Sequence, residues 1–430
     1  MNRGAFASRW RALPTALVVV SISAAPIADG ASGLGDQRAA EIAAKSPLVT
    51  SSVNILVSRA REIRDSAIRD ATLDALENAQ TCLRHRAGLG ERQKESILQT
   101  LSAAGLMDSK TRQSFPGGWV AGVFPPVLDD GTACPHLPQP FFAAPGGVFG
   151  KHHSFPGGLA VHEANNQTAA LNLLNEYTRM YGIPKSGPPV AENGADPRAT
   201  VAIDPDWLLA APVWHDWAKT IVFQWNVDGS EFPEMQIGGN GLTDNYGSRG
   251  DSRTGAHHIL SLAEAMSRRL PSGLIITQAC AHSSPTEGAE YKVVNWLRTA
   301  AIIARVDPVG EGYLVMDSIG HFRLPPLRKL GSVNLIAVGE VNMLPEYVLH
   351  NLSDADHPFS MAAAAATEII LKELAPEFGF HASDLTKYNL EFRNPVLSFF
   401  SADRLYIVYS SSGREGVKKE LEKAHQQAVF

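Results

Sequence analysis

Cysteine is scarce in this chain of 430 residues. The three cysteines are Cys82, Cys134 and Cys280, and no two of them are spaced as CxxC. A structural zinc site built from thiolates is therefore not expected. Cys82 and Cys134 can pair in an oxidising compartment, but their positions in the sequence do not decide whether they do. Cys280 lies in an apolar stretch, which favours a buried thiol.

Several catalytic and binding motifs are also missing. The sequence has no GxGxxG or GxxxxGK[ST] loop opening a helix, so cradling of a dinucleotide or a nucleoside triphosphate is not supported. No GxSxG elbow frames a serine nucleophile. His162-Glu163 lacks the second histidine of HExxH, which argues against a zinc protease. No repeat of fixed period is present.

Positive charge and long apolar runs are limited as well. The formal net charge is -6, which gives no general attraction to nucleic acid, and we expect no extended nucleic-acid surface. No stretch approaches the roughly 20 apolar residues of a transmembrane helix. Three arginines precede an apolar run at residues 16–22, and small residues follow it. This pattern predicts a signal peptide over residues 1–28 and an exported protein, periplasmic or extracellular.

The remaining composition, 44% hydrophobic and 19% charged, is typical of a globular protein. Apolar residues recur at three- and four-residue steps over much of the chain, which predicts a mainly α fold. The sequence divides into a helical N-terminal extension with a Pro/Gly-rich loop (29–149), a central domain (150–310) and a small mixed α/β extension (311–430).

Local signals place some of the elements. Asp204-Pro205 combines an N-cap acid with a first-turn proline, which predicts a helix start. Residues 221–227 favour a short hairpin before Asp228-Gly229, and residues 405–409 favour a strand. Further helices are expected from residue 159 to about 182, and at 256–270, 272–281, 287–306, 360–374 and 415–427.

Histidine is the most informative residue type. Seven of the 14 histidines fall between positions 152 and 282, and they are interleaved with aspartates. Histidine is the commonest metal ligand. In the doublet His215-Asp216 the carboxylate can bridge two ions, and Lys219 follows at helical spacing on the same side. These residues together indicate a site for metal and phosphate.

The order of these residues resembles the HD-domain metal-dependent phosphohydrolases, in the style of the exoribonuclease-like members, over residues 150–310. Gly157-Gly158-Leu159 approaches His162 as in that family, and His215-Asp216 matches the doublet that names it. His258-Ile259 is similar to the next ligand helix, and the helix that ends at Asp307 is similar to the closing one. The resemblance implies an HD-type helical bundle with six metal ligands, which are His162, His215, Asp216, His258, His282 and Asp307.

The same resemblance implies a chemistry. One or two divalent ions (Mn, Fe, Zn, Ni, Co or Mg) would activate water for hydrolysis of a phosphorylated small molecule or nucleotide, a phosphomonoester or a phosphodiester. Asp216 and Lys219 would be catalytic, with Lys219 neutralising a phosphoryl oxygen. His152 and His153 are candidates for substrate contact at the rim.

Three alternatives stay open at this point. His257 can replace its neighbour His258 as a ligand, although the residues that follow favour His258. A di-iron version of the same ligand set would activate oxygen instead of hydrolysing a phosphate ester. An inactive HD fold would serve as a binding module. The Pro/Gly-rich loops at 114–158 and 228–254 are expected to set substrate specificity, but they carry no recognisable code.

Overall fold

Helices make up most of this computed structural model, which describes residues 34–127, 133–182, 203–241, 251–286, 288–326 and 341–430. The predicted mainly α class is confirmed. The expected signal peptide at 1–28 lies outside the described residues. Among the helices of the described ranges, none is both long enough and apolar enough to span a membrane.

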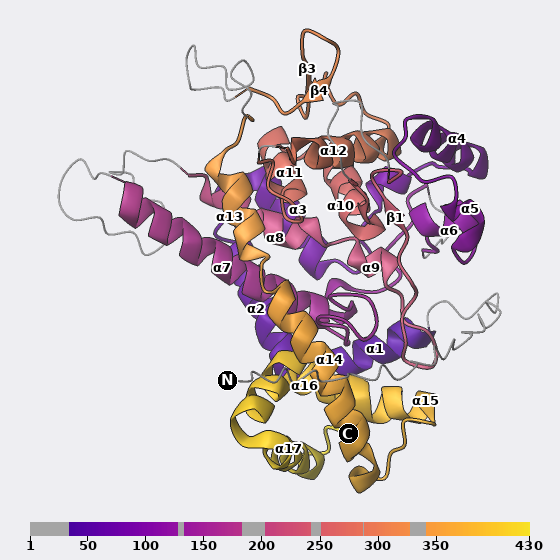
Figure 1. The fold of residues 1–430 in the computed structure, drawn as a ribbon, viewed down its shortest axis with the longest axis vertical. Coiled ribbons are helices and arrows are strands. Elements are labelled where there is room, and N and C mark those ends of the chain that lie inside the picture. Colours follow the sequence, from indigo (N-terminus) through magenta and orange to yellow (C-terminus); the bar gives the residue numbers. More distant parts are fainter. Residues whose placement is uncertain (1–33, 128–132, 183–202, 242–250, 287, 327–340) are drawn as a thin grey trace, which may run out of the picture. The chain divides into compact units, whose positions relative to one another are not determined.

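The chain runs through three groups of helices (Figure 1). The first group is α1 (Leu34–Lys45), α2 (Pro47–Ala60), α3 (Ser66–Glu77), α4 (Glu91–Ala103), α5 (Thr111–Ser114) and α6 (Gly118–Val123). The second is α7 (Gly158–Tyr181), α8 (Pro205–His215), α9 (Lys219–Val222), α10 (Ala256–Ser267), α11 (Ser272–Ala279) and α12 (Glu290–Ala304). The third is α13 (Pro345–Ser353), α14 (His357–Leu374), α15 (Leu385–Lys387), α16 (Asn394–Phe400) and α17 (Ala402–Gln426).

Strands are few and short in the described part. β1 (Gln236–Ile237) pairs antiparallel with β2 (Thr254–Gly255), and β3 (Val315–Met316) pairs antiparallel with β4 (Phe322–Arg323). The β1–β2 pair leads directly into α10, so it fixes where that helix begins.

The start of α8 was predictable from local chemistry. The side chain of Asp204 accepts a hydrogen bond from the Asp206 backbone N–H, and Pro205 occupies the first turn, where a missing N–H costs nothing. Pro212 lies inside the same helix, and the carbonyl oxygen of Pro212 lies 2.9 Å from Nδ1 of His215. The end of α8 therefore orients the first half of the His215-Asp216 doublet.

Residues 405–409 correct one prediction, because they belong to α17 and form no strand. Leu405 and Val408 are three positions apart and both pack into the C-terminal apolar cluster, which follows a helical period. The expected hairpin at 221–227 is only partly present. Its first residues end α9, and Trp225 pairs with Glu231 in a single bridge around the turn at Asp228-Gly229.

The core has two main apolar clusters. The larger extends from Ala43 to Tyr347 and joins helices of the first two groups with α13, so the core has no break near residue 150. The smaller joins α14, α16 and α17 around Phe155. Val161 packs against both clusters. The residue that follows it, His162, therefore lies where the two clusters meet.

Cysteine pairing is settled by the structure. Cys82 and Cys134 form a disulfide with their Cα atoms 5.5 Å apart, and Cys280 is a buried free thiol. The disulfide ties the segment after α3 to the loop before α7.

Candidate metal centre

A cluster of histidines and carboxylates forms where α7, α8, α10 and the segments after α11 and α13 converge. Its members are His162 on α7, His215 and Asp216 at the end of α8, His257 on α10, His282 after α11 and Asp354 after α13. Four of these six residues are buried, namely His162, His215, Asp216 and His257, whereas Asp354 is half-buried and His282 is more exposed. In the described residues, the groupings that could hold a metal ion draw on these side chains, together with Glu163, His153 and Asp356.

The Nε2 atoms of four histidines point at the carboxylates. Nε2 of His162 lies 3.4 Å from Oδ2 of Asp216 and 3.1 Å from Oδ1 of Asp354. Nε2 of His215 lies 3.4 Å and 3.5 Å from the same two oxygens. These four residues surround one position for a cation.

A second position lies on the other side of Asp216. Nε2 of His257 is 3.0 Å from Oδ1 of Asp216, and Nε2 of His282 is 3.9 Å from it. One carboxylate thus presents a different oxygen to each pair of histidines, which is the arrangement of a bridging ligand between two ions.

The Nδ1 atoms of the same histidines face other partners. Nδ1 of His215 lies 2.9 Å from the Pro212 carbonyl oxygen, and Nδ1 of His257 lies 2.5 Å from Oε1 of Glu234. Nδ1 of His282 lies 3.1 Å from Oγ1 of Thr254. In metal-binding histidines the ring nitrogen that does not bind the metal usually carries a proton, and its N–H donates a hydrogen bond to such a partner. The partner fixes the tautomer and the ring orientation.

Unsatisfied buried atoms test whether a cation fits. Nε2 of His215, Nε2 of His257 and Oδ1 of Asp216 are buried and accept or donate no hydrogen bond within the described residues. Leaving such groups unpaired costs free energy, typically about 1–3 kcal/mol each. A divalent ion would satisfy nitrogen and oxygen together, so the donor set fits a metal.

Charge in the cluster is strongly coupled. Burial alone would raise the pKa of Asp216, but His215, Lys219 and His257 outweigh it and hold that pKa well below its usual range. Burial would lower the pKa of His215, yet Asp216, Glu163 and Asp354 raise it well above the ordinary histidine value. A metal ion at this position would therefore have to compete with protons for the His215 imidazole.

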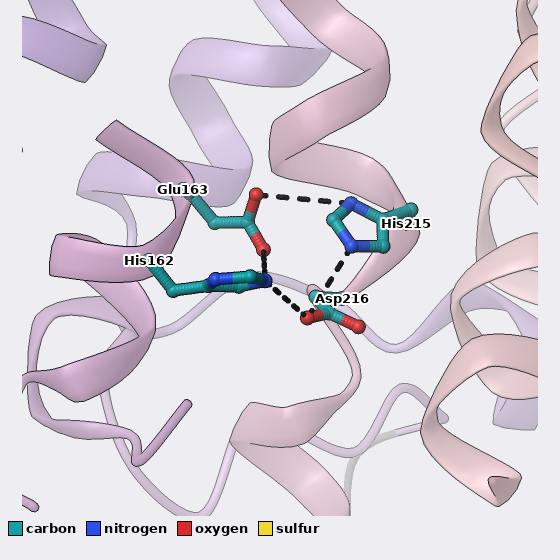
Figure 2. A group of neighbouring side chains, drawn as sticks. All are labelled: His162, Glu163, His215 and Asp216. Atoms are coloured by element: carbon teal, nitrogen blue, oxygen red, sulfur yellow. Dashed lines mark ion pairs between the residues drawn. The ribbon is translucent and has the colours of Figure 1, made fainter. Parts of the chain in front are cut away.

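Glu163 is a further member that the sequence did not single out. It is fully buried beside His162, and Figure 2 shows its carboxylate between His162 and His215. Its Oε2 lies 3.7 Å from Nδ1 of His215, and its Oε1 lies 4.0 Å from Nε2 of His162. Burial raises the pKa of Glu163 to about 8. The residue adds a third carboxyl group to the first cation position.

Lys219 lies where the sequence predicted, on the same side as the doublet. Its Nζ contacts Oδ2 of Asp216 and the carbonyl oxygen of Gly146, and its side chain is buried. Burial would lower the pKa of Lys219, but Asp216 and Glu163 raise it above the ordinary value. The ammonium group stays charged next to the cluster.

His258 does not face Asp216, which corrects the preference for it over His257. Nε2 of His258 lies 3.2 Å from the carbonyl oxygen of Ala279, and its ring stacks on His282 with centroids 4.2 Å apart. Consecutive helix positions point about 100° apart, so only one of the two neighbours can reach the carboxylate.

Asp307 is not brought to the cluster either. It is exposed beyond the end of α12, and its Oδ1 accepts the backbone N–H of Val309. Asp307 therefore stabilises a surface turn, and the carboxylate that lies beside His162 instead is that of Asp354, directly after α13. Of the six predicted ligands, His162, His215, Asp216 and His282 lie together, whereas His258 and Asp307 face other partners.

A cavity of about 450 Å³ opens onto the cluster. His152 and His357 line it together with Lys219, whereas His153 is buried behind it and contacts Asp356 and Ser360. Of the two expected rim histidines, only His152 borders the cavity.

Comparison with protein-family models, curated proteins and solved structures gives no match. The chemistry of the site is thus the basis for a functional proposal.

Some of the missed residues carried a signal in the sequence. Asp354 and Asp356 flank one alanine and precede His357, an acid-rich turn with a histidine of the kind that supplies metal ligands. Glu163 adjoins a predicted ligand. Nothing in the sequence shows that the turn after α13 folds back onto α7, because the contact joins residues almost 200 positions apart.

Proposed function

We propose that this chain is a metal-dependent phosphoric ester hydrolase of the HD type, acting on a phosphorylated small molecule or nucleotide. One observation carries the proposal: four histidine Nε2 atoms converge on Asp216, two at each of its oxygens. Two divalent ions held by these residues would stabilise the charge of a phosphoryl group and lower the pKa of a nucleophilic water. A single ion in the first position is the simpler version of the same proposal.

Each residue has a distinct role in this proposal. His162, His215 and Asp354 would hold the first ion, His257 and His282 the second, and Asp216 would contact both. Lys219 would keep Asp216 ionised and place a positive charge at the cavity wall, where the phosphate oxygens gain negative charge in the transition state. His152 and His357 lie at the cavity and could donate hydrogen bonds to a phosphate.

The cavity supports a compact substrate. Its volume of about 450 Å³ falls within the range of about 300–1,000 Å³ that is usual for small-molecule pockets. A single phosphorylated metabolite or nucleotide fits that range, while an extended polymer would have to leave most of its length outside.

Metal analysis of the purified protein, combined with a panel of phosphomonoesters and phosphodiesters, tests the proposal. We expect one or two divalent ions per chain in the wild type and hydrolysis of at least one substrate in the panel. Asp216→Ala should lose bound metal and reduce hydrolysis at least about 100-fold, since even partners of metal ligands cost 10–100-fold. Asp307→Asn is the matched control, because Asp307 is exposed and away from the cluster.

The same experiment separates the alternatives. Two irons with oxygen uptake and no phosphate release would favour an oxygenase. Tight binding of a phosphorylated ligand without turnover would favour a binding module. A protein without metal, in which Asp216→Ala hydrolyses phosphate esters as fast as the wild type, would contradict the hydrolase proposal.

A further inference from the structure

The Nδ1 side of His162 differs from that of the other three histidines. No short contact holds it, and its nearest acidic partner is Oδ1 of Asp356, 3.7 Å away. Both atoms are buried and lack a hydrogen bond within the described residues. When a metal binds Nε2 of His162, the ring proton is on Nδ1, and Asp356 is the carboxylate that can accept its hydrogen bond.

Asp356 is held from its other side. Its Oδ2 accepts a hydrogen bond from Nδ2 of Asn165 at 3.1 Å and lies 3.2 Å from Nε2 of His153. Asn165 is on α7, three residues after His162, whereas Asp356 directly precedes α14. The carboxylate therefore links the first ligand helix to the C-terminal helices.

His153 extends this connection to α17. Its ring is 4% exposed, and its Nδ1 lies 3.7 Å from Oδ2 of Asp403 near the start of α17. The hydroxyl of Ser360 donates to Oδ1 of Asp403 at 2.7 Å. A line of polar side chains thus runs from Asp403 through His153 and Asp356 to His162, in which the two histidines are buried and the two carboxylates are half-buried.

The backbone at His153 is strained in a way that favours this role. His153 has a φ of 50°, in the left-handed region that costs a residue other than glycine about 1 kcal/mol or more. Its carbonyl oxygen accepts the N–H groups of Gly146 and Phe155, which hold the conformation. The strain places the imidazole against Asp356 and away from the cavity.

We propose that Asp356 is a positioning residue for the metal centre, and that His153 and Asn165 hold it in place. It would accept the Nδ1–H of His162, so that Nε2 is the free lone pair directed at the first cation position. The inference rests on the metal centre of the proposed function. It gives the α13–α14 turn two roles, since the turn would supply Asp354 to the metal and Asp356 to orient His162.

Cobalt titration followed by visible absorption tests the inference in the full chain. Asp356→Ala should weaken Co²⁺ binding at the first position by about 10–100-fold and change the absorption of that ion. Asp356→Asn keeps an oxygen acceptor and should recover most of the affinity. Asp403→Ala is the matched control, because it removes a carboxylate from the same polar line without touching His162, and we expect an affinity within threefold of the wild type.

The outcomes distinguish this inference from the proposed function. A wild type that binds no Co²⁺ overturns both. A wild type that binds Co²⁺, with a folded Asp356→Ala variant that binds it equally well, overturns the positioning role alone. Equal losses in Asp356→Ala and Asp403→Ala would also overturn it, because they would trace the effect to packing of the C-terminal helices.

A measurement on the wild type covers the case in which Asp356→Ala does not fold. In Zn²⁺-loaded protein with ¹⁵N-labelled histidine, His162 should carry its ring proton on Nδ1, and that proton should exchange slowly with solvent. Loss of the signal in His162→Gln assigns it. A ring proton on Nε2 of His162 would contradict the inference directly.

Discussion

Single residues decide the chemistry of this site, and neighbours in the sequence do very different things. His257 points Nε2 at Asp216, whereas His258 packs its ring on His282. His152 borders the cavity, whereas His153 is buried behind it. The direction of a side chain on its element, more than its residue type, separates a candidate ligand from a packing residue.

The pair His257 and His258 offers a direct test at this scale. His257→Ala should remove the ion shared with His282 and weaken its binding at least about 100-fold, because a ligand is lost. His258→Phe keeps a ring against His282 and should keep the metal content, at a cost of about 1 kcal/mol for the lost bond to Ala279. Cobalt stoichiometry and thermal unfolding of both variants measure the difference.

Equal metal content in the two variants would argue for a single ion in the first position. A loss confined to His258→Phe would contradict the assignment of ligands on α10.

The sequence predicted much of the residue set but not all of it. His162, His215, Asp216, Lys219 and His282 were expected together and lie together. The choice between His257 and His258 failed because it depends on the rotation of α10 about its axis, which β1, β2 and Glu234 fix. Asp354 was missed because its approach to α7 is a long-range contact without a local pattern.

Elements place the ligands through a few close backbone contacts. The first turn of α7 packs against the loop at His153, and Gly158 lies in the contact. A Cβ on Gly158 would overlap the carbonyl oxygen of His153. Gly158, the second of the two glycines before His162, is therefore needed for steric reasons. It allows the strained loop at His153 to lie against the first turn of α7.

Gly158→Ala should therefore disturb both stability and metal binding. Overpacking of this kind costs about 1–3 kcal/mol, and the shift of the first turn of α7 should also displace His162. Gly150→Ala is the control: Gly150 has a φ of 75° but no atom within 4 Å of the added Cβ, so only the backbone cost of about 1 kcal/mol applies. Denaturant unfolding and Co²⁺ affinity of both variants provide the comparison.

If Gly158→Ala lost stability but kept its Co²⁺ affinity, the close contact at Gly158 would stabilise α7 without positioning His162.

Element prediction from the sequence succeeded where the signal was local. The cap at Asp204 and Pro205 marked the start of α8, and the apolar period marked α7, α10 and α12. The strand expected at 405–409 failed because residues of high strand propensity such as Tyr406 and Ile407 are carried by a helix whose packing on α14 outweighs that preference.

Across the whole molecule, stability should depend on pH through a buried carboxyl that is not part of the metal centre. Asp36 in the first turn of α1 accepts the Trp225 backbone N–H at 2.7 Å, and burial raises its pKa to about 7. Because the pKa of Asp36 is higher in the folded than in the unfolded state, the folded state binds this proton more tightly. The contribution of Asp36 is thus fully present below about pH 4 and is lost as the pH rises through about 7.

Asp36→Asn keeps the acceptor oxygen and removes the ionisation. The variant should therefore gain stability over the wild type between pH 5 and pH 8, by a few kcal/mol at most. Urea unfolding of both proteins at the two pH values measures the change. If the free energy of unfolding changed with pH equally in the two proteins, Asp36 would not be the source of the change, and this prediction would be wrong.

The turn between α13 and α14 carries Asp354, Asp356 and His357, while His162 lies far earlier in the chain. During synthesis a ribosome must therefore deliver more than four-fifths of the polypeptide before the first cation position has all its carboxylates. Shorter nascent chains contain only part of the ligand set, so the protein would reach its full affinity for an ion only near the end of synthesis. Metal loading would then report that the C-terminal helices have folded.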